Sequence, residues 1–348
     1  MVIKTSEELR ELSIMIFKKA GVVDSAAKRI TEHLVNSNLV GMDSHGVIRI
    51  PDYIQWIKEG IIDLKAQMKI INETFIITVI DGHFSFGQVV MYKACEIAIM
   101  KAKEYGISLT TIRNVSHIGR LGEYAEKIAN ERMVCMIAVN GQGAGQYVAP
   151  YGGISRRLSV NPMAWGIPTG IKEKPLVLDI STTIVSEGKI KTKINKGESI
   201  PKGWVIDSDG KQTANPKDLY GPPEGSLLPF GKHKGFGLSM IVDILAGGLS
   251  GGGCSRPGVK KFYNSICVVA INPQIVQATG FIESVDNLIS YVKSSEPIKG
   301  FNEILVPNEI EWRTREKRLN EGIEIDDNTW NLIVKTAKDL GVHLKKNL

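Results

Sequence analysis

Residues 88–116 read QVVMYKACEIAIMKAKEYGISLTTIRNVS, and this stretch decides the fold class. Its first part has apolar side chains at helical spacing and ends at Gly106, which predicts an amphipathic helix over residues 88–105. Its second part, residues 107–116, is rich in Ile, Thr and Val, as β-strands are. The stretch therefore predicts a protein in which helices pack against a β-sheet.

Upstream of this stretch, the first 70 residues are predicted to be helical. Thr5 and Glu8 have the spacing of a capping box and begin a helix that Gly21 ends. A second helix is expected from residue 24 to residue 41, and the segment PDYIQWIKEG, residues 51–60, predicts a third. The segment FIITVIDGHFSFG, residues 75–87, has strand composition, and its Asp-Gly pair at 81–82 predicts a turn.

Downstream, strands and helices alternate on either side of a long glycine-rich segment. MVCMIAVN (133–140) predicts a strand, and residues 141–232 contain many Gly and Pro with few helical periods. A long apolar helix is expected over residues 234–251, followed by a strand at 265–273, a helix at 284–295, a short strand at 303–307 and two final helices within 309–321 and 326–340. Helical ends around a mixed middle predict an α/β or α+β protein whose termini pack together.

The composition narrows the class of protein. The 348 residues are 43% hydrophobic and 23% charged, which is typical of a globular protein with a packed core. A net charge of +6 is too small at this length for a nucleic-acid-binding protein, so no nucleic-acid partner is expected. The four cysteines form no C-x-x-C pair, and there is no signal-peptide core or membrane-length apolar run. We therefore expect a cytoplasmic protein without a membrane partner.

Three of the six histidines are candidates for chemistry. His33 and His343 are expected at the surface and His83 in a loop. The other three stand in glycine-rich segments, where a histidine does not serve to fill a core: His45, His117 and His233.

Three segments could hold a ligand, and each has a simpler structural explanation. His117 stands between a predicted strand and a predicted helix, and it is either a ligand contact or simply a residue of the loop. The GKHKG loop, residues 231–235, either binds a phosphate group or is a basic turn without a ligand. The segment PLVLDISTT, residues 175–183, leads from a strand to Asp179 and a Ser-Thr-Thr loop, which contact a polar ligand or cap a turn. No G-x-G-x-x-G, P-loop or metal-site motif occurs, so neither an ordinary dinucleotide fold nor a metal is predicted.

Taken in order, the motifs resemble one family, the malate/L-lactate dehydrogenase-like oxidoreductases, which include sulfolactate and ureidoglycolate dehydrogenases. The matching stretches span nearly the whole chain: DSHGVIRIPDYI (43–54), IRNVSHIGRLGEYA (112–125), APYGG (149–153), SVNPMAWGIP (159–168), LVLDISTT (176–183), GKI (188–190), IPKGWVIDSDGKQT (200–213), LLPFGKHKGFGLSMIVDILAGGLSG (227–251) and LVPNEIEWRTREKR (305–318).

This resemblance implies an α/β, mixed-sheet, non-Rossmann dehydrogenase fold with its helical N- and C-terminal segments packed together. It implies NAD or NADP as cofactor and a homodimer. We expect three units: residues 1–70 with 306–348 as a helical domain, residues 71–120 with 233–305 as a cofactor-binding sheet domain, and residues 121–232 as a glycine-rich domain facing substrate and cofactor.

The resemblance also assigns site residues. His117 and His45 are the candidate acid/base residues, with His117 favoured as proton donor and His45 as a substrate contact. Arg49 corresponds to the family's carboxylate contact, and a helix through residues 45–50 would place His45 and Arg49 on one face. Ser44 and Ser116 are further substrate candidates. The cofactor candidates are Asn140, Leu178, Asp179, Ile180, Ser181, His233, Lys234, Asn308 and Glu309.

The sequence departs from the family pattern at three of its motif positions. Ser116 stands where many members have Asn, Gly141 where Ser is common, and Asn308 where Gly is common. The expected function is interconversion of a small 2-hydroxy acid and a 2-oxo acid by hydride transfer, of the malate, lactate or sulfolactate type. The alternatives are a reductase of a cyclic imine acid or keto sugar acid, a phosphate-binding transferase that uses residues 231–235, and a scaffold without activity.

Overall fold

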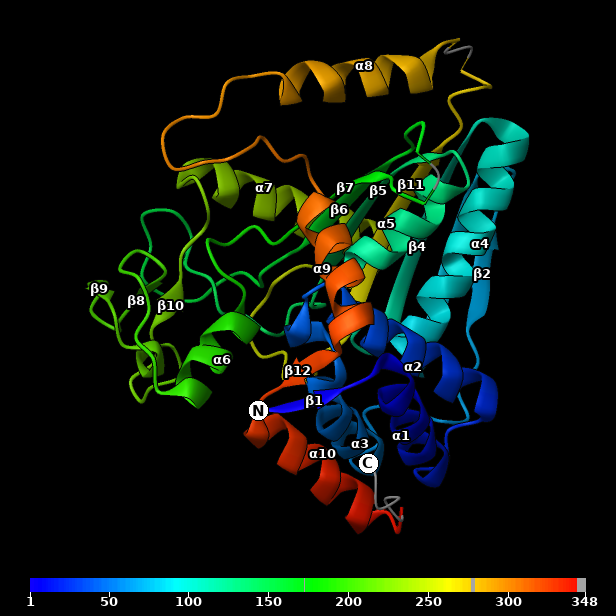
Figure 1. Ribbon diagram of the computed structural model, residues 1–348. Helices are drawn as coiled ribbons and strands as arrows, with labels where there is room; N and C mark the ends of the chain where they lie inside the picture. The colour runs from blue at the N-terminus through cyan, green and yellow to red at the C-terminus, as the bar shows by residue number, and fades with distance from the viewer. Residues whose placement is uncertain (172, 277–278, 343–348) are drawn as a thin grey trace.

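A seven-stranded mixed sheet forms the centre of the molecule (Figure 1). The computed structural model describes residues 1–171, 173–276 and 279–342, so His343 lies outside the described residues. Strands β3 and β4 pair in parallel, and the other neighbours in the sheet are antiparallel. The strand order across the sheet is β2 (Lys69–Glu73), β3 (Ile77–Ser85), β4 (Ile107–Val115), β11 (Asn264–Ile271), β5 (Val134–Asn140), β6 (Met163–Ile167) and β7 (Leu176–Ile180).

Helices cover both faces of this sheet because its central strands bury both faces. Along β11, Ile266, Val268 and Ala270 join one core while Cys267 and Val269 join the other. This alternation follows from the two-residue period of a strand. Helices α4 (Gly87–Tyr105) and α5 (Leu121–Asn130) cover the first face, and α7 (His233–Asp243) with the π-helical turn η4 (Ile244–Gly248) covers the second (Figure 1).

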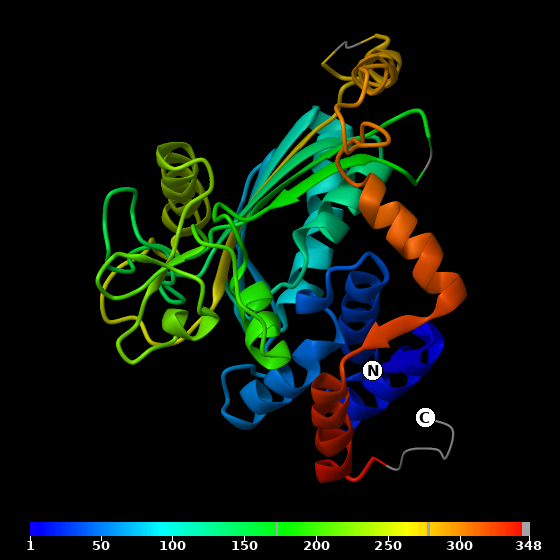
Figure 2. The ribbon, with the colours of Figure 1, turned by 60° about the vertical axis from the view of Figure 1, so that its left-hand side comes forward.

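The two ends of the chain form one helical base, as the sequence predicted. Its core contains residues from the first 62 positions together with Ile323, Ile325 and Ile333. Strand β1 (Val2–Lys4) pairs antiparallel with β12 (Ile323–Ile325), a pair that the sequence did not reveal. Both views place the N-terminal strand beside the C-terminal helix (Figures 1 and 2). The helices of the base are α1 (Ser6–Lys19), α2 (Asp24–Leu39), α3 (Ile50–Lys58), α9 (Glu309–Glu321) and α10 (Asp327–Asp339).

The glycine-rich segment builds a lobe with its own small core (Figure 2, green). Val148, Val185, Ile190 and Leu227 are among its buried residues. Helix α6 of this lobe was missed because the sequence pattern there has few helical periods. The elements of the lobe are α6 (Glu187–Lys196), β8 (Val205–Ile206), β9 (Gln212–Thr213), the 3₁₀ turn η3 (Pro216–Leu219) and β10 (Ser226–Leu227).

The structure confirms several predictions that rest on sequence patterns only a few residues long. The capping box at the start of α1 is present, with the Glu8 amide donating to the Thr5 hydroxyl at 3.1 Å and the Thr5 amide donating to the Glu8 carboxylate at 2.7 Å. The predicted helices at 88–105, 309–321 and 326–340 correspond to α4, α9 and α10. The predicted helix at 284–295 corresponds to α8 (Phe281–Lys293).

Two local predictions were wrong. The Asp81-Gly82 pair makes no turn, because β3 continues through it. A side chain at Gly82 would stand 2.1 Å from Val115, so glycine there allows β3 to approach β4 rather than to reverse direction. The stretch at 303–307 is not a strand, because it leads into α9 and pairs with no strand among the described residues. The division into three units stays a prediction, and the central sheet draws strands from both the second and the third range.

We predict that Ile323→Ala lowers the free energy of unfolding by about 2–5 kcal/mol, since Ile323 is fully buried and joins the two ends of the chain. Glu324→Ala changes an exposed neighbour in the same strand and is expected to stay within about 0.5 kcal/mol. Urea denaturation of both variants checks this. Equal stability of the two variants would contradict a shared core at the termini.

Candidate active site

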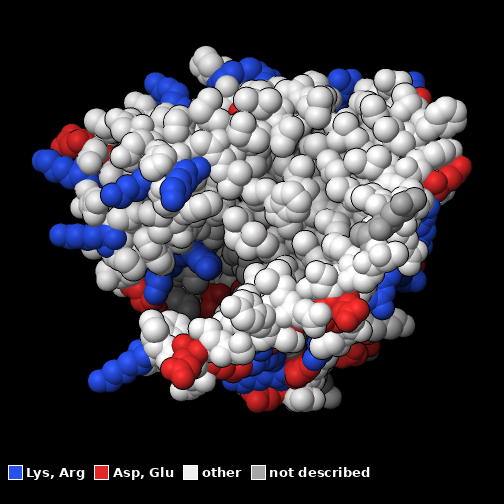
Figure 3. Space-filling view, turned by 90° about the horizontal axis from the view of Figure 1, so that it is seen from above, with Lys and Arg blue, Asp and Glu red and all other residues white. Residues whose placement is uncertain are grey.

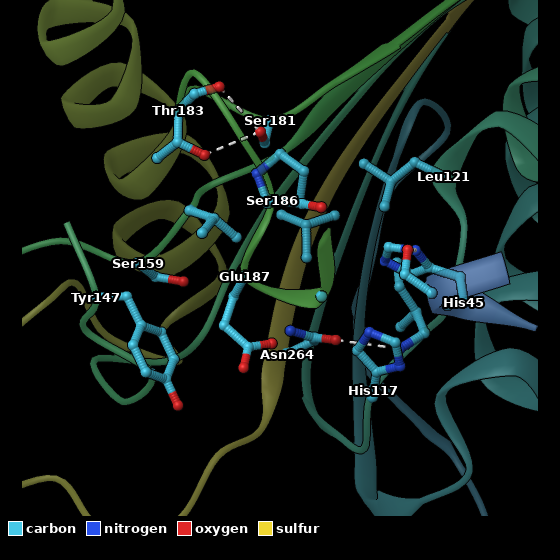
Figure 4. A pocket seen from close by; sticks show the side chains of 18 of the residues that line it. His45, His117, Leu121, Tyr147, Ser159, Ser181, Thr183, Ser186, Glu187 and Asn264 are labelled. Carbon is cyan, nitrogen blue, oxygen red and sulfur yellow. Dashed lines mark hydrogen bonds between the residues drawn. The ribbon is translucent and has the colours of Figure 1, made fainter. Parts of the chain in front are cut away.

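One cavity of about 880 Å³ brings together residues from all three parts of the chain. Figure 4 shows His45 and His117 on one side of it, and Ser159, Tyr147 and Glu187 on the other. The predicted residues that line this cavity are Ser44, His45, Arg49, His117, Asn140, Asp179, Ile180 and Ser181.

The segment that carries His45 and Arg49 is not the single helix that was expected. It forms two 3₁₀ turns, η1 (Asp43–His45) and η2 (Val47–Arg49), which are separated by Gly46 in an extended conformation. Asn38 of α2 imposes this shape: its Oδ1 accepts from the Val47 amide at 2.8 Å, and a side chain at Gly46 would collide with it. A tertiary contact therefore overrides the local helical preference.

Arg49 nevertheless lies against the histidine segment. Its Nε donates to the Ser44 carbonyl at 2.8 Å, and its Nη1 donates to Asp52 at 3.2 Å. Nη2 has no hydrogen-bond partner among the described residues. The guanidinium is thus fixed on one edge and has donor capacity left for an anion.

The two candidate histidines stack on each other. Their ring centroids are 5.5 Å apart and their planes differ by 21°. His45 Nδ1 lies 3.0 Å from the Ser44 hydroxyl, and His117 Nδ1 lies 2.9 Å from the Tyr53 hydroxyl. Gln88 Nε2 donates to the same Tyr53 oxygen at 2.7 Å. The Tyr53 oxygen can also accept from an Nδ1–H of His117, and the neutral ring in that tautomer keeps a lone pair on Nε2.

The sequence analysis missed Tyr53 and Gln88 as parts of this site. Both are fully buried, and each lies on the apolar side of a helix, Tyr53 in α3 and Gln88 in α4. A glutamine among the apolar residues of α4 was the one available signal, because a buried amide needs partners.

Burial and a nearby cation keep both histidines neutral. Burial first, and then the Arg49 guanidinium, lower the pKa of His45 to about 3. The pKa of His117 is also held well below its ordinary value, again by burial first and then by Arg49. An anion bound to Arg49 would offset the second cause and raise both values.

His33 is not at the surface, as the sequence had suggested, but fully buried. Its Nε2 accepts from the Arg120 amide at 2.8 Å, and its Nδ1 lies 2.9 Å from Glu123 Oε2. The ring stacks on Tyr124 at 5.2 Å. Gly119 has a φ of +81°, and a side chain there would strike His33. The helix α2 thus supports the loop that carries His117.

Asp179 and Asn140 form hydrogen bonds with neighbouring helices as well as lining the cavity. Asp179 accepts from the Gly122 amide at 2.7 Å, and burial raises its pKa while Arg120 opposes that rise. The Asn140 amide donates to Asp243 at 3.0 Å and to the Gly253 carbonyl at 3.0 Å.

The remaining predicted residues do not line the cavity. Ser116 is buried and its hydroxyl accepts from the Gly87 amide at 3.0 Å. His233 and Lys234 are exposed, and the Lys234 amide is already bonded to the Gly231 carbonyl. Asn308 is buried at the start of α9 with a φ of +80°, and the neighbouring Glu309 pairs with Lys293. Leu178 lies in the edge strand β7.

Comparison with known proteins identifies the family. The family model described as malate/L-lactate dehydrogenase matches residues 5–334. The chain belongs to the malate/L-lactate dehydrogenase family. Among curated members, the L-sulfolactate dehydrogenase of Methanocaldococcus jannaschii is 37% identical, over 99% of this chain and 99% of that protein.

Solved structures of members of this malate/L-lactate dehydrogenase family have the same fold. The malate dehydrogenase of Pyrococcus horikoshii matches with a TM-score of 0.87 at 32% identity, over 98% of this chain and 96% of that one. The delta1-piperideine-2-carboxylate reductase of Pseudomonas syringae matches with a TM-score of 0.81 at 26% identity, over 97% and 100%. The predicted mixed-sheet dehydrogenase fold is confirmed.

Membership in a dehydrogenase family implies a nicotinamide cofactor, and the cavity suits one. Its volume is near the upper end of the range for small-molecule sites, about 300–1,000 Å³, and exceeds what a three- or four-carbon acid fills. Ser159 is buried and faces the cavity, and its hydroxyl makes no hydrogen bond to any described residue (Figure 4). A buried polar group of this kind is ready to bind a ligand.

We predict that His33→Leu lowers the free energy of unfolding by about 1–3 kcal/mol, because the buried Arg120 amide loses its acceptor. Lys28→Ala, on the exposed side of the same helix, is the matched control and is expected to change stability by less than about 0.5 kcal/mol. Chemical denaturation measures both. A His33 variant as stable as the control would mean that the loop 116–120 does not depend on α2.

Proposed function

We propose that this protein interconverts a small 2-hydroxy acid and the corresponding 2-oxo acid by hydride transfer with NAD or NADP. The observation that carries the proposal is the grouping of Arg49, His45 and His117 in one cavity. Such a reaction needs an anchor for the carboxylate and a group that exchanges a proton with the substrate oxygen, and these residues supply both.

The nicotinamide ring supplies or accepts the hydride when the cofactor is bound. Asn140 and the end of β7 with the following residue, Leu178 to Ser181, are proposed to hold the cofactor, since most of them line the cavity beside the histidines. His233, Lys234, Asn308 and Glu309 stay in the proposal as cofactor contacts on the strength of the family motifs, although they lie outside the cavity lining.

Arg49 is proposed to bind the substrate carboxylate through its unpaired Nη2. The Ser44 carbonyl and Asp52 hold the guanidinium in place, so little side-chain freedom is lost on binding. Ser44 also contacts His45, which places its hydroxyl near the same carboxylate. Ser116 has a supporting part, because its hydroxyl accepts from the first amide of α4 next to His117.

His117 is proposed as the proton donor for reduction and the acceptor for oxidation, with His45 holding the substrate. The support is the chain Gln88–Tyr53–His117, which fixes the orientation of the His117 ring and directs Nε2 away from Tyr53. His45 instead contacts Ser44, next to the carboxylate anchor. A substrate anion on Arg49 would favour the charged imidazolium that reduction consumes.

A second candidate function is reduction of a cyclic imine acid. The structural similarity to a delta1-piperideine-2-carboxylate reductase favours it, since a cyclic imine with an adjacent carboxylate presents the same anchor and the same reacting carbon. A phosphate-binding transferase has no support from this site, because Lys232, His233 and Lys234 are exposed and absent from the cavity lining.

A homodimer in the cytoplasm is also part of the proposal. Met240, Ile241 and Ile244 are exposed along α7 and η4, as is Leu249 directly after them, and monomeric proteins seldom expose such a row. The centre of the face that includes α8 shows few charged side chains (Figure 3).

The four cysteines are free, which agrees with a reducing compartment. Within the described ranges, no helix has the length and apolarity to cross a membrane, and no His, Cys, Asp or Glu cluster suits a metal ion.

The test is absorbance at the nicotinamide band with purified protein, NADH or NADPH, and a panel of 2-oxo acids beside delta1-piperideine-2-carboxylate. Turnover of an open-chain 2-oxo acid supports the first function, and turnover of the imine acid alone supports the second. No oxidation of either cofactor with any substrate would contradict both.

We predict that Arg49→Met lowers kcat/KM for the acid substrate by a factor corresponding to about 2 kcal/mol, the scale of a lost charge-assisted pair. The affinity for the cofactor, measured by fluorescence titration, is expected to stay the same. An equal loss of cofactor affinity would contradict the role of carboxylate anchor.

The lowered histidine pKa values predict an unusual pH dependence. In the protein without substrate the pKa of the proposed proton acceptor, His117, lies well below its ordinary value of 6.5, so kcat/KM for oxidation should show no inflection near pH 6.5. For reduction the protonated form is required, so kcat/KM should keep rising as the pH falls from 8 to 5.5. Steady-state kinetics across this range measure both directions.

The matched variants for this profile are His117→Asn and His45→Asn. The first should lower kcat by about 10²–10⁴ and abolish the rise of kcat/KM for reduction toward low pH, and the second should retain the rise. The opposite pattern would exchange the two roles.

A further inference from the structure

Helix α6 begins inside the substrate cavity, beside the proposed carboxylate anchor. Ser186, Glu187 and Gly188 all line the cavity. A side chain at Gly188 would stand 2.8 Å from Cβ of Ser44 and 3.7 Å from Nη2 of Arg49. Because adjacent Cα atoms are only about 3.8 Å apart, Glu187 lies next to the group that would hold the substrate.

The carboxylate of Glu187 is directed into the cavity, across from His45 and His117 (Figure 4). The Tyr220 hydroxyl donates to Glu187 Oε1 and holds the carboxylate in place. The pKa of Tyr220 is raised by burial and by this carboxylate. Tyr220 itself does not line the cavity, so it acts from behind Glu187.

No cation neutralises Glu187 directly within the described part of the chain. Lys189 and Lys260 also line the cavity, but both are exposed, and neither is within ion-pair distance of Glu187. The guanidinium of Arg120 is already bound by both oxygens of Glu126. The cavity therefore presents a partly free guanidinium for one carboxylate, with a fixed carboxylate beside it.

We propose that Glu187 determines substrate choice: it selects 2-hydroxy and 2-oxo acids with a single negative charge and disfavours those with a second anionic group. The inference rests on the proposed function and specifies its substrate class. A second carboxylate or sulfonate, one or two carbons from the reacting centre, would meet the Glu187 carboxylate in a partly buried cavity, where like charges repel strongly. A neutral group that donates a hydrogen bond would instead be accepted there.

This preference for substrates with one negative charge would distinguish the protein from several of its relatives. Malate and sulfolactate, which appear in their names, each carry two negative charges, whereas lactate carries one. The identity of 30–37% to these proteins leaves room for such a change at one position of the cavity.

The experiment compares malate with its 4-amide, which has nearly the same shape and one negative charge fewer. The wild-type protein is expected to oxidise the amide with a kcat/KM at least about tenfold higher than that for malate. In Glu187→Gln the two values should come within about threefold, chiefly because malate improves. Malate preferred by the wild type, or a ratio unchanged in Glu187→Gln, would overturn the inference.

Two control variants separate the charge of Glu187 from its structural contact. Tyr220→Phe removes the hydrogen bond but keeps the carboxylate, so the preference for the amide should remain. Glu224→Gln removes a carboxylate outside the cavity lining and should also keep the wild-type ratio. Loss of the preference in Tyr220→Phe as well as in Glu187→Gln would assign the effect to structure and contradict the charge mechanism.

Failure of the inference can be told apart from failure of the proposed function. If the function is wrong, the wild type oxidises neither acid; if only the inference is wrong, it oxidises both without the expected ratio.

Should Glu187→Gln fold poorly, the wild-type ratio is measured from about 10 mM to 1 M salt, where the screening length falls from about 30 to 3 Å. The preference for the amide should shrink as salt rises, and a ratio independent of salt would overturn the inference.

Discussion

The amide of Arg120 donates to Nε2 of His33, and this one bond couples the helical base of the molecule to the sheet above it. It crosses from α2 to the loop between β4 and α5, which carries His117. The same helix supplies Asn38, which shapes the turn that carries His45. Both candidate catalytic histidines therefore take their positions from α2, a helix that contributes no residue to the cavity lining.

Electrostatics explains how these histidines can serve a reversible reaction. Burial and Arg49 keep both rings neutral without substrate, which is the state that accepts a proton from a 2-hydroxy acid. The anionic substrate itself would weaken the influence of Arg49 and favour the charged state that reduction needs. Because the 2-hydroxy acid and the 2-oxo acid are both anions, either one bound to Arg49 would raise the pKa of both rings toward the range in which a histidine can accept and donate a proton.

The cavity joins parts of the chain with different tasks. The base and the sheet provide Arg49 and the histidines, which suit any acid with a 2-oxo or 2-hydroxy group. The lobe provides Glu187, Tyr147 and Ser159, which line the cavity on the side away from the two histidines (Figure 4). Substitutions in the lobe can then alter which acid is accepted while leaving the reacting groups unchanged.

The sequence by itself determined the family, the mixed-sheet dehydrogenase fold, most helices, and eight candidate residues that line the cavity. These follow from local patterns and ordered motifs. Only the tertiary structure decided that Gly82 permits close strand packing rather than a turn, that residues 43–49 form two turns around Asn38, and that His33 is buried. It also showed that Gln88 and Tyr53 form hydrogen bonds leading to His117 and that Glu187 lines the cavity. Their hydrogen-bond partners lie 33 residues or more away along the chain, and side-chain spacing within one element contains no information about such contacts.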